Sequence, residues 1–295
     1  MKKTNFPNNK VSKLLKNKTI LITGGAGSVG SKLAERILDF QVRQVRIIDI
    51  NEHALFQLKR ELNDSRLRIL FGSITDKERL EIAGKNVDII IHAAALKNIE
   101  ITEFNAIDTI NINVNGTVNM IKMAIKNEPA MFLNISTDKA AGSSTIYGTT
   151  KELGEKITTW AKIHFKDTKF ASVRFGNVIE TRGNVFEVWE KENKDGKPLS
   201  ITNPDMKRYF FHINEAVNFV LECLTKINDG TVFIPKMKAY KIKELAEKIS
   251  KKHKVIGLRP GEKMEEVLIT DEERKNAFEE KEMWILKLKN NMSGF

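Results

Sequence analysis

Tyr147 and Lys151 are the residues whose spacing points most directly to chemistry, because they form the pattern Y-x-x-x-K. Four residues apart on a helix, the two side chains lie on one face. An ammonium beside a phenol favours the phenolate, so we expect Lys151 to lower the pKa of Tyr147 and to make it a base near neutral pH. The pattern also occurs by chance, so its meaning depends on the other residues of the site.

A hydroxyl, a carboxyl and an amine stand side by side at Thr137, Asp138 and Lys139. They follow the apolar run 131–136, which we predict to be a strand, and doubly wound sheets bind ligands at the carboxyl ends of their strands. The three groups are therefore expected next to Tyr147, where they could carry acid–base steps. The alternative is an exposed Asp138–Lys139 ion pair of the kind that is common on surfaces and stabilises little.

A glycine turn with the spacing G-x-x-G-x-x-G is formed by Gly24, Gly27 and Gly30. It follows an apolar run at 18–23 and precedes a helical pattern, which is the context of a dinucleotide-binding turn. Glycine is needed there because the backbone turns tightly and approaches a pyrophosphate, and the next helix offers free N–H groups. We expect Ser28 and Val29 to contact the cofactor as well. The alternative interpretation of the glycine motif is an ordinary tight turn without a ligand.

The nicotinamide cofactor is expected to be NAD rather than NADP. Asp49 ends the second predicted strand, where a carboxylate can accept hydrogen bonds from the adenosine ribose and would repel a 2′-phosphate. No arginine follows directly; a helix cap is the other reading of Asp49. Small side chains after the fourth predicted strand would let the backbone lie against the cofactor at Ala93, Ala94 and Ala95. His92 alone is read as a packed, hydrogen-bonded histidine.

The elements that must position these residues alternate between strand and helix. Continuous apolar runs are typical of buried parallel strands, and they occur at 18–23, 44–49, 67–72, 87–92, 131–136 and 170–175. Helical patterns lie between them, so the sequence predicts an α/β fold with a doubly wound parallel sheet. We expect a Rossmann domain over 14–175, with 207–230 packing back onto it, and a smaller lobe made of 176–206 and 231–295.

Composition favours a folded, soluble protein of 295 residues, 41% of them hydrophobic. The longest apolar run, near 87–96, is too short to span a bilayer, and no signal peptide follows the basic N-terminus. The single cysteine, Cys223, is read as an inert core thiol, which favours a cytoplasmic location. The net charge of +11 is spread along the chain, so we expect a small polyphosphate rather than nucleic acid as the ligand, and no metal site.

The segments TGGAGSVG, HAAALK, STDKAAGSSTIYGTTK and RPGEK together resemble the UDP-N-acetylglucosamine 4,6-dehydratases of the polysaccharide-biosynthesis group. The resemblance runs from about Lys18 to Leu268. It implies an extended short-chain dehydrogenase/reductase, closest to the short, soluble, C5-inverting type that starts pseudaminic acid synthesis. Retaining, membrane-anchored relatives lack the tyrosine, so Tyr147 favours the inverting branch.

The resemblance also implies a mechanism for these residues. Tyr147, helped by Lys151, would take the O4 proton while a hydride leaves C4 for the nicotinamide. Lys139, with its pKa lowered by burial, would remove the C5 proton, and Asp138 would protonate the departing C6 hydroxyl. Thr137 would orient the substrate, and the hydride would return to C6. The NAD would thus be recycled within each turnover and would stay tightly bound.

The smaller lobe would hold the UDP-sugar. By resemblance, Arg208 and Arg259 would contact the diphosphate and Glu262 a ribose hydroxyl, because a planar guanidinium suits bidentate phosphate contacts. Further substrate contacts are implied for Lys97, Asn177 and Arg182. Ser73 stands where the family usually has an aspartate that contacts adenine, and we expect it and Ile74 to touch the cofactor.

Two other functions remain open on the sequence. A nucleotide-sugar 4-epimerase would need the tyrosine and the cofactor but not the Asp138–Lys139 pair. An NAD-binding regulator without catalysis could use the same scaffold. By resemblance the protein is expected to form a homo-oligomer through helices beside Tyr147. The sequence leaves the exact sugar undecided.

Overall fold

The computed structural model describes residues 9–287, so the start of the basic N-terminal segment and the last eight residues of the predicted lobe lie outside it. Within this range a nine-stranded sheet has the order β13-β14-β10-β6-β5-β4-β1-β2-β3. Its first six strands in sequence are parallel. They are β1 (Thr19–Thr23), β2 (Gln44–Asp49), β3 (Leu67–Phe71), β4 (Ile89–His92), β5 (Met131–Thr137) and β6 (Lys169–Phe175).

The six predicted strands are confirmed, and their burial explains why the sequence identifies them. Every residue of β1, β4 and β5 is buried, as expected for central strands covered on both faces. Thr23 pairs with His92, which pairs with Asn134, so the carboxyl ends of β1, β4 and β5 meet at one edge of the sheet. The glycine turn and Thr137 both follow at this edge.

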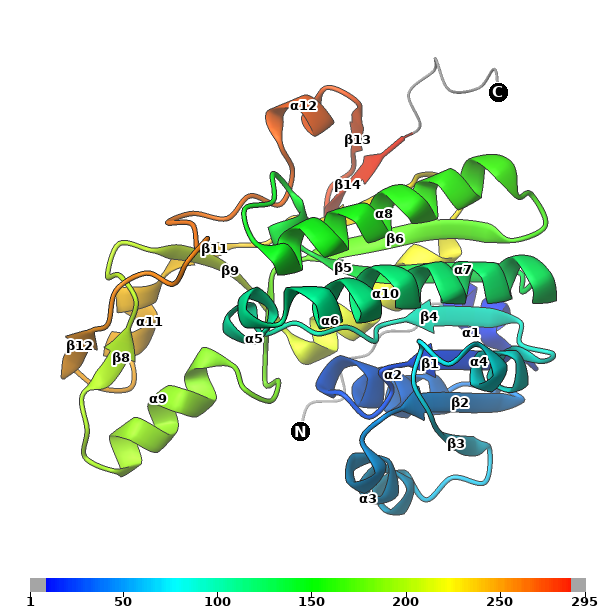
Figure 1. Ribbon diagram of the computed structural model, residues 1–295, viewed down its shortest axis with the longest axis horizontal. Coiled ribbons are helices and arrows are strands. Elements are labelled where there is room, and N and C mark those ends of the chain that lie inside the picture. The colour runs from blue at the N-terminus through cyan, green and yellow to red at the C-terminus, as the bar shows by residue number, and fades with distance from the viewer. Residues whose placement is uncertain (1–8, 288–295) are drawn as a thin grey trace.

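Helices cover both faces of the sheet (Figure 1). One apolar core lies under α1 (Asn9–Leu15), α2 (Ser28–Leu38), α3 (Glu52–Leu62) and α10 (Ile213–Thr225). A second lies on the other face under α4 (Lys77–Gly84), α7 (Gly116–Asn127) and α8 (Ile146–His164). Asp76 caps α4 by accepting a hydrogen bond from the Arg79 N–H. No helix within residues 9–287 is both long and apolar enough to cross a membrane.

The large sheet also takes in strands from the C-terminal half of the chain. β10 (Val232–Pro235) pairs in parallel with β6, and β14 (Met283–Leu286) and β13 (Ala277–Glu279) follow as antiparallel strands. These strands fall within 231–295, which the sequence assigned wholly to the smaller lobe, so that boundary is wrong. Strands of three or four residues carry too short a pattern to reveal their partners. Helix α10, in contrast, packs against α1 and α2, close to the predicted position.

The smaller lobe stands beyond the carboxyl edge of the sheet (Figure 1, left). Trp189, fully buried, lies in its apolar core. The lobe contains β7 (Asn177–Ile179), α9 (Val185–Lys194), β8 (Leu199–Ile201), β9 (Lys207–His212), β11 (Ala239–Lys241), α11 (Ile242–Glu247) and β12 (His253–Val255). Short helices complete the described chain: α5 (Ile99–Phe104), α6 (Ala106–Ile110), the π-helix η1 (Asn111–Asn115), the 3₁₀-helix η2 (Asp138–Ala140) and α12 (Asp271–Arg274).

Candidate active site

The glycine turn brings the backbone of β1 against the end of β4. Gly24 has a φ of +64°, and a Cβ on it would lie 2.8 Å from the Ala94 backbone, so only glycine fits. A Cβ on Gly30 would collide with the Gly24 carbonyl. The turn leads into α2, whose first N–H groups have no intrahelical acceptor. A close backbone approach followed by free donors fits a dinucleotide pyrophosphate.

Asp49 lies beside this turn at the end of β2. Its Oδ2 accepts a hydrogen bond from the Ala26 N–H at 3.0 Å, and its Oδ1 accepts one from the Asn51 N–H at 3.0 Å. The carboxylate is thereby fixed at the edge of the glycine turn and remains partly exposed. Asn51, not Asp49, caps α3. The position therefore fits a carboxylate that accepts hydrogen bonds from an adenosine ribose.

A cavity of about 510 Å³ lies between the sheet edge and the smaller lobe. Residues from both sides of the predicted site line it: Val29, Ala93, Ala95, Lys97, Thr137, Lys139, Tyr147, Lys151, Asn177, Arg182, Arg208, Arg259 and Glu262. Other predicted site residues, within the described chain, do not line it: Gly24, Gly27, Ser28, Gly30, Asp49, Ser73, Ile74, Ala94 and Asp138. The structure thus brings most of the predicted catalytic and substrate residues together in one space.

Lys139 on the wall of this cavity forms a buried ion pair with Asp138, which does not line the cavity. The Lys139 Nζ lies 3.0 Å from Asp138 Oδ1, and the lysine and aspartate side chains are 12% and 0% exposed. Thr137 donates a second hydrogen bond to the same Oδ1 at 3.0 Å. Asp138 Oδ2 is buried without a hydrogen-bond partner among the described residues. The alternative of a solvated surface pair is therefore wrong.

The pKa of Lys139 is raised, which is the opposite of the lowered value that the sequence predicted. Burial by itself lowers the pKa of this amine, but the charges of Asp138 and Glu266 and the hydrogen bond to Asp138 outweigh it. The prediction counted desolvation and omitted the second carboxylate. At neutral pH Lys139 is therefore an ammonium held between two acids.

Burial raises the pKa of Tyr147, although Lys139 and a hydrogen bond with Thr137 act in the opposite direction. The lowered pKa expected from Lys151 is thus wrong, and the cation that favours the phenolate is Lys139. Lys151 is buried, which lowers its pKa to about 8, while Glu155 raises it. Lys151 is therefore still mostly protonated at neutral pH and loses its proton as the pH rises through about 8.

Glu266 is a buried carboxylate of this site that the sequence did not single out. It is 7% exposed, and burial raises its pKa while the charges of Lys139, Arg208 and Lys263 lower it and that of Asp138 raises it. It stands three residues after the RPGEK motif, but the alternating charges of that stretch gave no sign of which acid points inward. The cavity wall also includes Val185, Thr202 and Phe210 on short lobe segments, which carry no motif.

His92 is a structural residue, as predicted. Its Nδ1 lies 2.7 Å from the Thr23 Oγ1 and its Nε2 lies 3.0 Å from the Thr117 Oγ1. Burial, together with the charge of Lys151, lowers its pKa to about 3, so the ring stays neutral. The thiol of Cys223 is likewise buried, and burial raises its pKa, which confirms the inert core thiol.

Arg208 and Glu262, predicted to contact the diphosphate and a ribose, also contact each other. The Arg208 guanidinium lies 3.1 Å from Glu262 Oε1, and both side chains are 7% exposed. Arg208 further donates to the carbonyl oxygens of Lys207, Lys263 and Met264. Much of its donor capacity is thus used to hold the RPGEK segment against β9. Arg259 remains exposed on the cavity wall.

Three other predicted substrate residues lie where two segments meet. Arg182 donates to the Ala26 carbonyl at 2.6 Å, and its N–H to Ser28 Oγ at 3.0 Å, so this residue also contacts the glycine turn. Lys97 donates to the Arg182 carbonyl at 3.4 Å. Asn177 donates to the Tyr209 carbonyl at 3.0 Å, which ties β7 to β9.

The predicted adenine contacts Ser73 and Ile74 have different surroundings. The Ser73 hydroxyl lies 2.8 Å from that of Thr75 and accepts a hydrogen bond from the Thr75 N–H, forming a turn after β3. Ile74 is 5% exposed and packs against Gly116 in the core. Its side chain is therefore occupied by packing.

Comparison with known proteins places the chain among sugar-modifying enzymes. The sequence profile of a family described as polysaccharide biosynthesis protein matches residues 20–288. An uncharacterized membrane protein of Methanocaldococcus jannaschii is 40% identical, over 94% of this chain and 87% of that protein. An inverting UDP-N-acetylglucosamine 4,6-dehydratase of Campylobacter jejuni is 34% identical, over 90% and 81%. A UDP-glucose 4-epimerase of Rickettsia canadensis is 33% identical, over 88% and 80%.

Solved structures agree on the fold. The X-ray structure of Pen from Bacillus thuringiensis superposes with a TM-score of 0.89 at 33% identity, covering 92% of this chain and 88% of that one. A dTDP-glucose 4,6-dehydratase of Streptomyces venezuelae, solved with NAD and TYD bound, gives a TM-score of 0.75 at 18% identity, over 87% and 90%. The predicted doubly wound, Rossmann-like fold is thus confirmed.

Proposed function

The chain belongs to the polysaccharide biosynthesis protein family, among extended short-chain dehydrogenase/reductase enzymes that act on nucleotide sugars, and from this premise we propose that it is a 4,6-dehydratase. Its substrate would be UDP-N-acetylglucosamine, and its product a UDP-4-keto-6-deoxy sugar with inverted C5. The relatives support an enzyme that acts on a nucleotide sugar, because they include both dehydratases and epimerases. They do not by themselves distinguish between these two reactions.

One observation favours the dehydratase over the epimerase: Lys139 lines the same cavity as Tyr147 and Lys151, and it is paired there with Asp138, which is buried directly behind it. An epimerase needs a base for the 4-hydroxyl and a cofactor, but it has no C5 proton to remove and no C6 hydroxyl to expel. A buried acid–amine pair is costly to keep unless it has a function. Its place beside the tyrosine supports elimination.

The ion pair can generate both reactive groups in one step. Transfer of one proton from Lys139 Nζ to Asp138 Oδ1, across 3.0 Å, gives a free amine and a neutral carboxylic acid together. The amine would then remove the C5 proton, and the acid would protonate the C6 hydroxyl, which leaves as water. This arrangement makes the raised pKa of Lys139 compatible with its role as a base.

The other residues would prepare and complete this elimination. A nicotinamide cofactor bound at the glycine turn would supply the hydride acceptor at C4 and the hydride donor at C6, and a proton that exchanges with solvent would be added to C5 on the opposite face. Tyr147 would take the O4 proton as the phenolate, the form that the charge of Lys139 favours, after losing its own proton, and the Thr137 hydroxyl, close to the phenol, would orient the 4-hydroxyl. Lys151 would hold the nicotinamide ribose. Asp49 favours NAD, and recycling within a turnover favours a cofactor that stays bound.

Incubation of the purified protein with UDP-N-acetylglucosamine tests the proposal. We expect a product lighter by one water, without added cofactor, and with deuterium from heavy water at C5. Mass spectrometry and NMR give the product mass and the C5 configuration. A panel of UDP-, dTDP-, GDP- and CDP-sugars would define the nucleotide. If no sugar of the panel loses water, the dehydratase assignment is refuted.

Lys139→Ala should lower turnover by about 10²- to 10⁴-fold, because it removes the proposed C5 base. NAD binding should be unchanged. Lys126→Ala is the matched control, since Lys126 forms an exposed ion pair with Glu81 and does not line the cavity, so its loss should have no effect. Full turnover by Lys139→Ala would show that another group removes the C5 proton.

A nucleotide-sugar 4-epimerase is the second candidate, favoured by the relatives of that name and by Thr137, Tyr147 and Lys151. Its product would have the mass of the substrate and a C6 that still carries its hydroxyl. The same mass spectrum therefore separates the two enzymes. An NAD-binding regulator would bind the cofactor and convert neither.

A further inference from the structure

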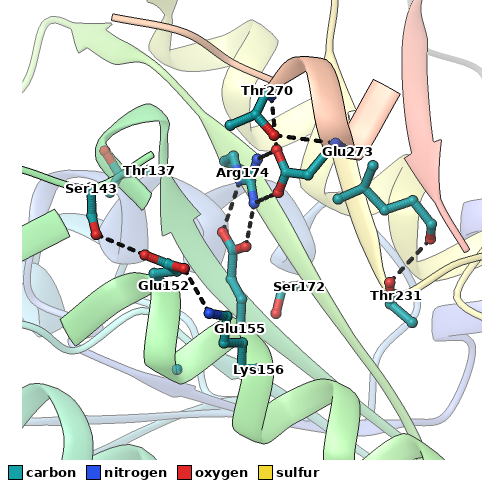
Figure 2. A network of polar contacts seen from close by, with 12 residues as sticks. Thr137, Ser143, Glu152, Glu155, Lys156, Ser172, Arg174, Thr231, Thr270 and Glu273 are labelled. Carbon is teal, nitrogen blue, oxygen red and sulfur yellow. Dashed lines mark hydrogen bonds and ion pairs between the residues drawn. The ribbon is translucent and has the colours of Figure 1, made fainter. Parts of the chain in front are cut away.

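A buried charge cluster next to the cavity contains none of the groups proposed to react, although one of its acids, Glu155, raises the pKa of Lys151. The guanidinium of Arg174 on β6 is 2% exposed and lies between two carboxylates. It donates to both oxygens of Glu155 at 3.0 and 2.6 Å, and to both oxygens of Glu273 at 2.8 and 2.7 Å. Figure 2 shows the two acids converging on it, one from α8 and one from the C-terminal segment.

Each member of the cluster belongs to a different part of the site. Glu155 stands four and eight residues after Lys151 and Tyr147 on α8, so it lies on their face of the helix. Arg174 pairs with Ser136 in the sheet and therefore neighbours the strand that ends in Thr137. Glu273 belongs to the segment 259–273, which begins with Arg259 and Glu262 on the cavity wall.

Glu273 is fixed within its own segment as well. The Thr270 N–H donates to its carboxylate at 2.9 Å, and its own N–H donates to the Thr270 hydroxyl at 3.2 Å, which forms a capping box at α12. Arg174 also donates to the Leu268 carbonyl at 3.1 Å. One guanidinium thus holds both the backbone and the side chain of this segment.

The charges of Arg174, Glu155 and Glu273 compensate one another, so the cluster depends on all three residues. Burial would lower the pKa of Arg174, but Glu155 and Glu273 raise it overall, and Arg174 in turn keeps the pKa of Glu273 low against the effect of burial. Two carboxylates at this depth are tolerable only with the cation between them. Because Arg174 makes two hydrogen bonds to each acid, it fixes the orientation of each carboxylate as well as its distance from the guanidinium.

The N-terminal part of segment 259–273 makes its contacts with other parts of the chain. Lys263 donates to the Gly142 carbonyl, the Ser144 hydroxyl donates to the Gly261 carbonyl at 2.8 Å, and Arg208 binds Glu262. The contacts of Lys263 and Ser144 are exposed, and Arg208 and Glu262 line the cavity. Arg174 is the buried attachment of the segment to the helix that carries Tyr147 and Lys151.

We propose that Arg174 is a positioning residue that locks segment 259–273 to α8 through Glu273 and Glu155, and thereby holds Arg259 and Glu262 in place for the nucleotide. The role of Arg259 and Glu262 rests on the proposed function, whereas the lock does not. Loosening the lock should weaken nucleotide binding and leave the catalytic groups on η2 and α8 in place.

Glu273→Gln tests the lock, because it removes one charge and keeps the side-chain size. Glu280→Gln is the matched control: Glu280 pairs with Lys226 at 2.8 Å and is 30% exposed, against 27% for Glu273, but it ties the C-terminal region to α10. Hydrogen exchange of peptides from 259–273 should accelerate in Glu273→Gln and not in Glu280→Gln. UDP, as a probe, should bind about tenfold more weakly to Glu273→Gln only.

Kinetics distinguish positioning from general stability. In Glu273→Gln the KM for the nucleotide sugar should rise while kcat stays within about twofold, whereas a loss of folded protein would lower the apparent kcat alone. Arg174→Lys should behave like Glu273→Gln, since one ammonium cannot make bidentate contacts to two acids.

Unchanged hydrogen exchange of 259–273 in Glu273→Gln would overturn the lock, whatever the substrate. Faster exchange with unchanged UDP affinity would overturn its role in nucleotide binding. If the wild type binds no UDP, the proposed function fails, and the exchange result still decides the lock.

Discussion

At the scale of single residues, the site depends on which charges are buried together. Asp138 and Lys139 would contribute little on the surface, but inside the protein they form a buried ion pair close to Tyr147. Glu266 adds a second negative charge near Lys139 and keeps it protonated. The cluster therefore sets how strongly Lys139 holds its proton.

Glu266→Gln should lower the pKa of Lys139, because one of the two acids that raise it is removed. Lys139 then loses its proton to solvent at a lower pH, so its labelling, and any limb of the kcat profile that follows its titration, should move to lower pH. The groups that face Glu266 are Lys139, Asp138, Arg208 and Lys263, and all remain. Competitive labelling of Lys139 at varied pH, read by mass spectrometry, gives its pKa without turnover.

Glu265→Gln is the control for this experiment. Glu265 is the neighbouring acid, but it is exposed and pairs with Lys207. Its loss should leave both the profile and the labelling of Lys139 unchanged. Equal shifts in the two variants would show that a general change of charge, and not the buried contact, acts on Lys139.

At the scale of elements, the turn between β1 and α2 shows how backbone geometry prepares a binding site. Gly24 combines a left-handed φ with a close approach to the end of β4. Helix α2 then begins at that same edge of the sheet. A side chain on Gly24 would have to displace the backbone of Ala94, and with it the wall against which the cofactor is proposed to lie.

Gly24→Ala should therefore weaken NAD binding by more than tenfold, about 1.4 kcal/mol. Gly196→Ala is a control with a similar left-handed φ of +70°, where a Cβ would meet no atom of the described chain within 4 Å. It should destabilise the protein by about 1 kcal/mol through its backbone alone and leave NAD affinity unchanged. Calorimetric titration and thermal unfolding separate the two effects. Normal NAD affinity in Gly24→Ala would argue against a cofactor at this turn.

At the scale of the whole molecule, several large apolar side chains are exposed on three helices that contact one another. Phe104 and Ile107 on α5 and α6 are each 84% exposed, and Leu153 and Trp160 on α8 are 42% and 46% exposed. Both short helices contact α8, so these side chains belong to neighbouring elements beside Tyr147. Such a patch commonly marks an interface, and we propose that a second copy of the chain covers it.

Trp160→Glu should shift the protein toward the monomer mass of 33.6 kDa, because a carboxylate cannot be buried in an apolar contact. Light scattering after gel filtration measures the mass. Val255→Glu provides the control, since Val255 is 58% exposed on β12 in the smaller lobe. A wild type that is already monomeric at micromolar concentration would contradict the proposed interface.

The sequence by itself determined the six parallel strands β1 to β6 and most of the candidate groups. Buried parallel strands are apolar throughout, so β1 to β6 are visible as runs, and the glycine turn follows from local backbone requirements. The Y-x-x-x-K spacing places Tyr147 and Lys151 on one helical face wherever that helix lies. These features depend on residues close together in the chain, which is why a local pattern is enough to reveal them.

Only the tertiary structure decided the direction in which the pKa values of the site residues shift. The pKa values of Tyr147 and Lys139 are shifted in the direction opposite to the one predicted from the sequence, because burial of the phenol and the acids around the amine, Glu266 among them, dominate. The attachment of 259–273 to α8 through Arg174 joins three distant segments in the same way. Electrostatic energy depends on distance and solvent exposure in the folded molecule, and the order of residues along the chain specifies neither.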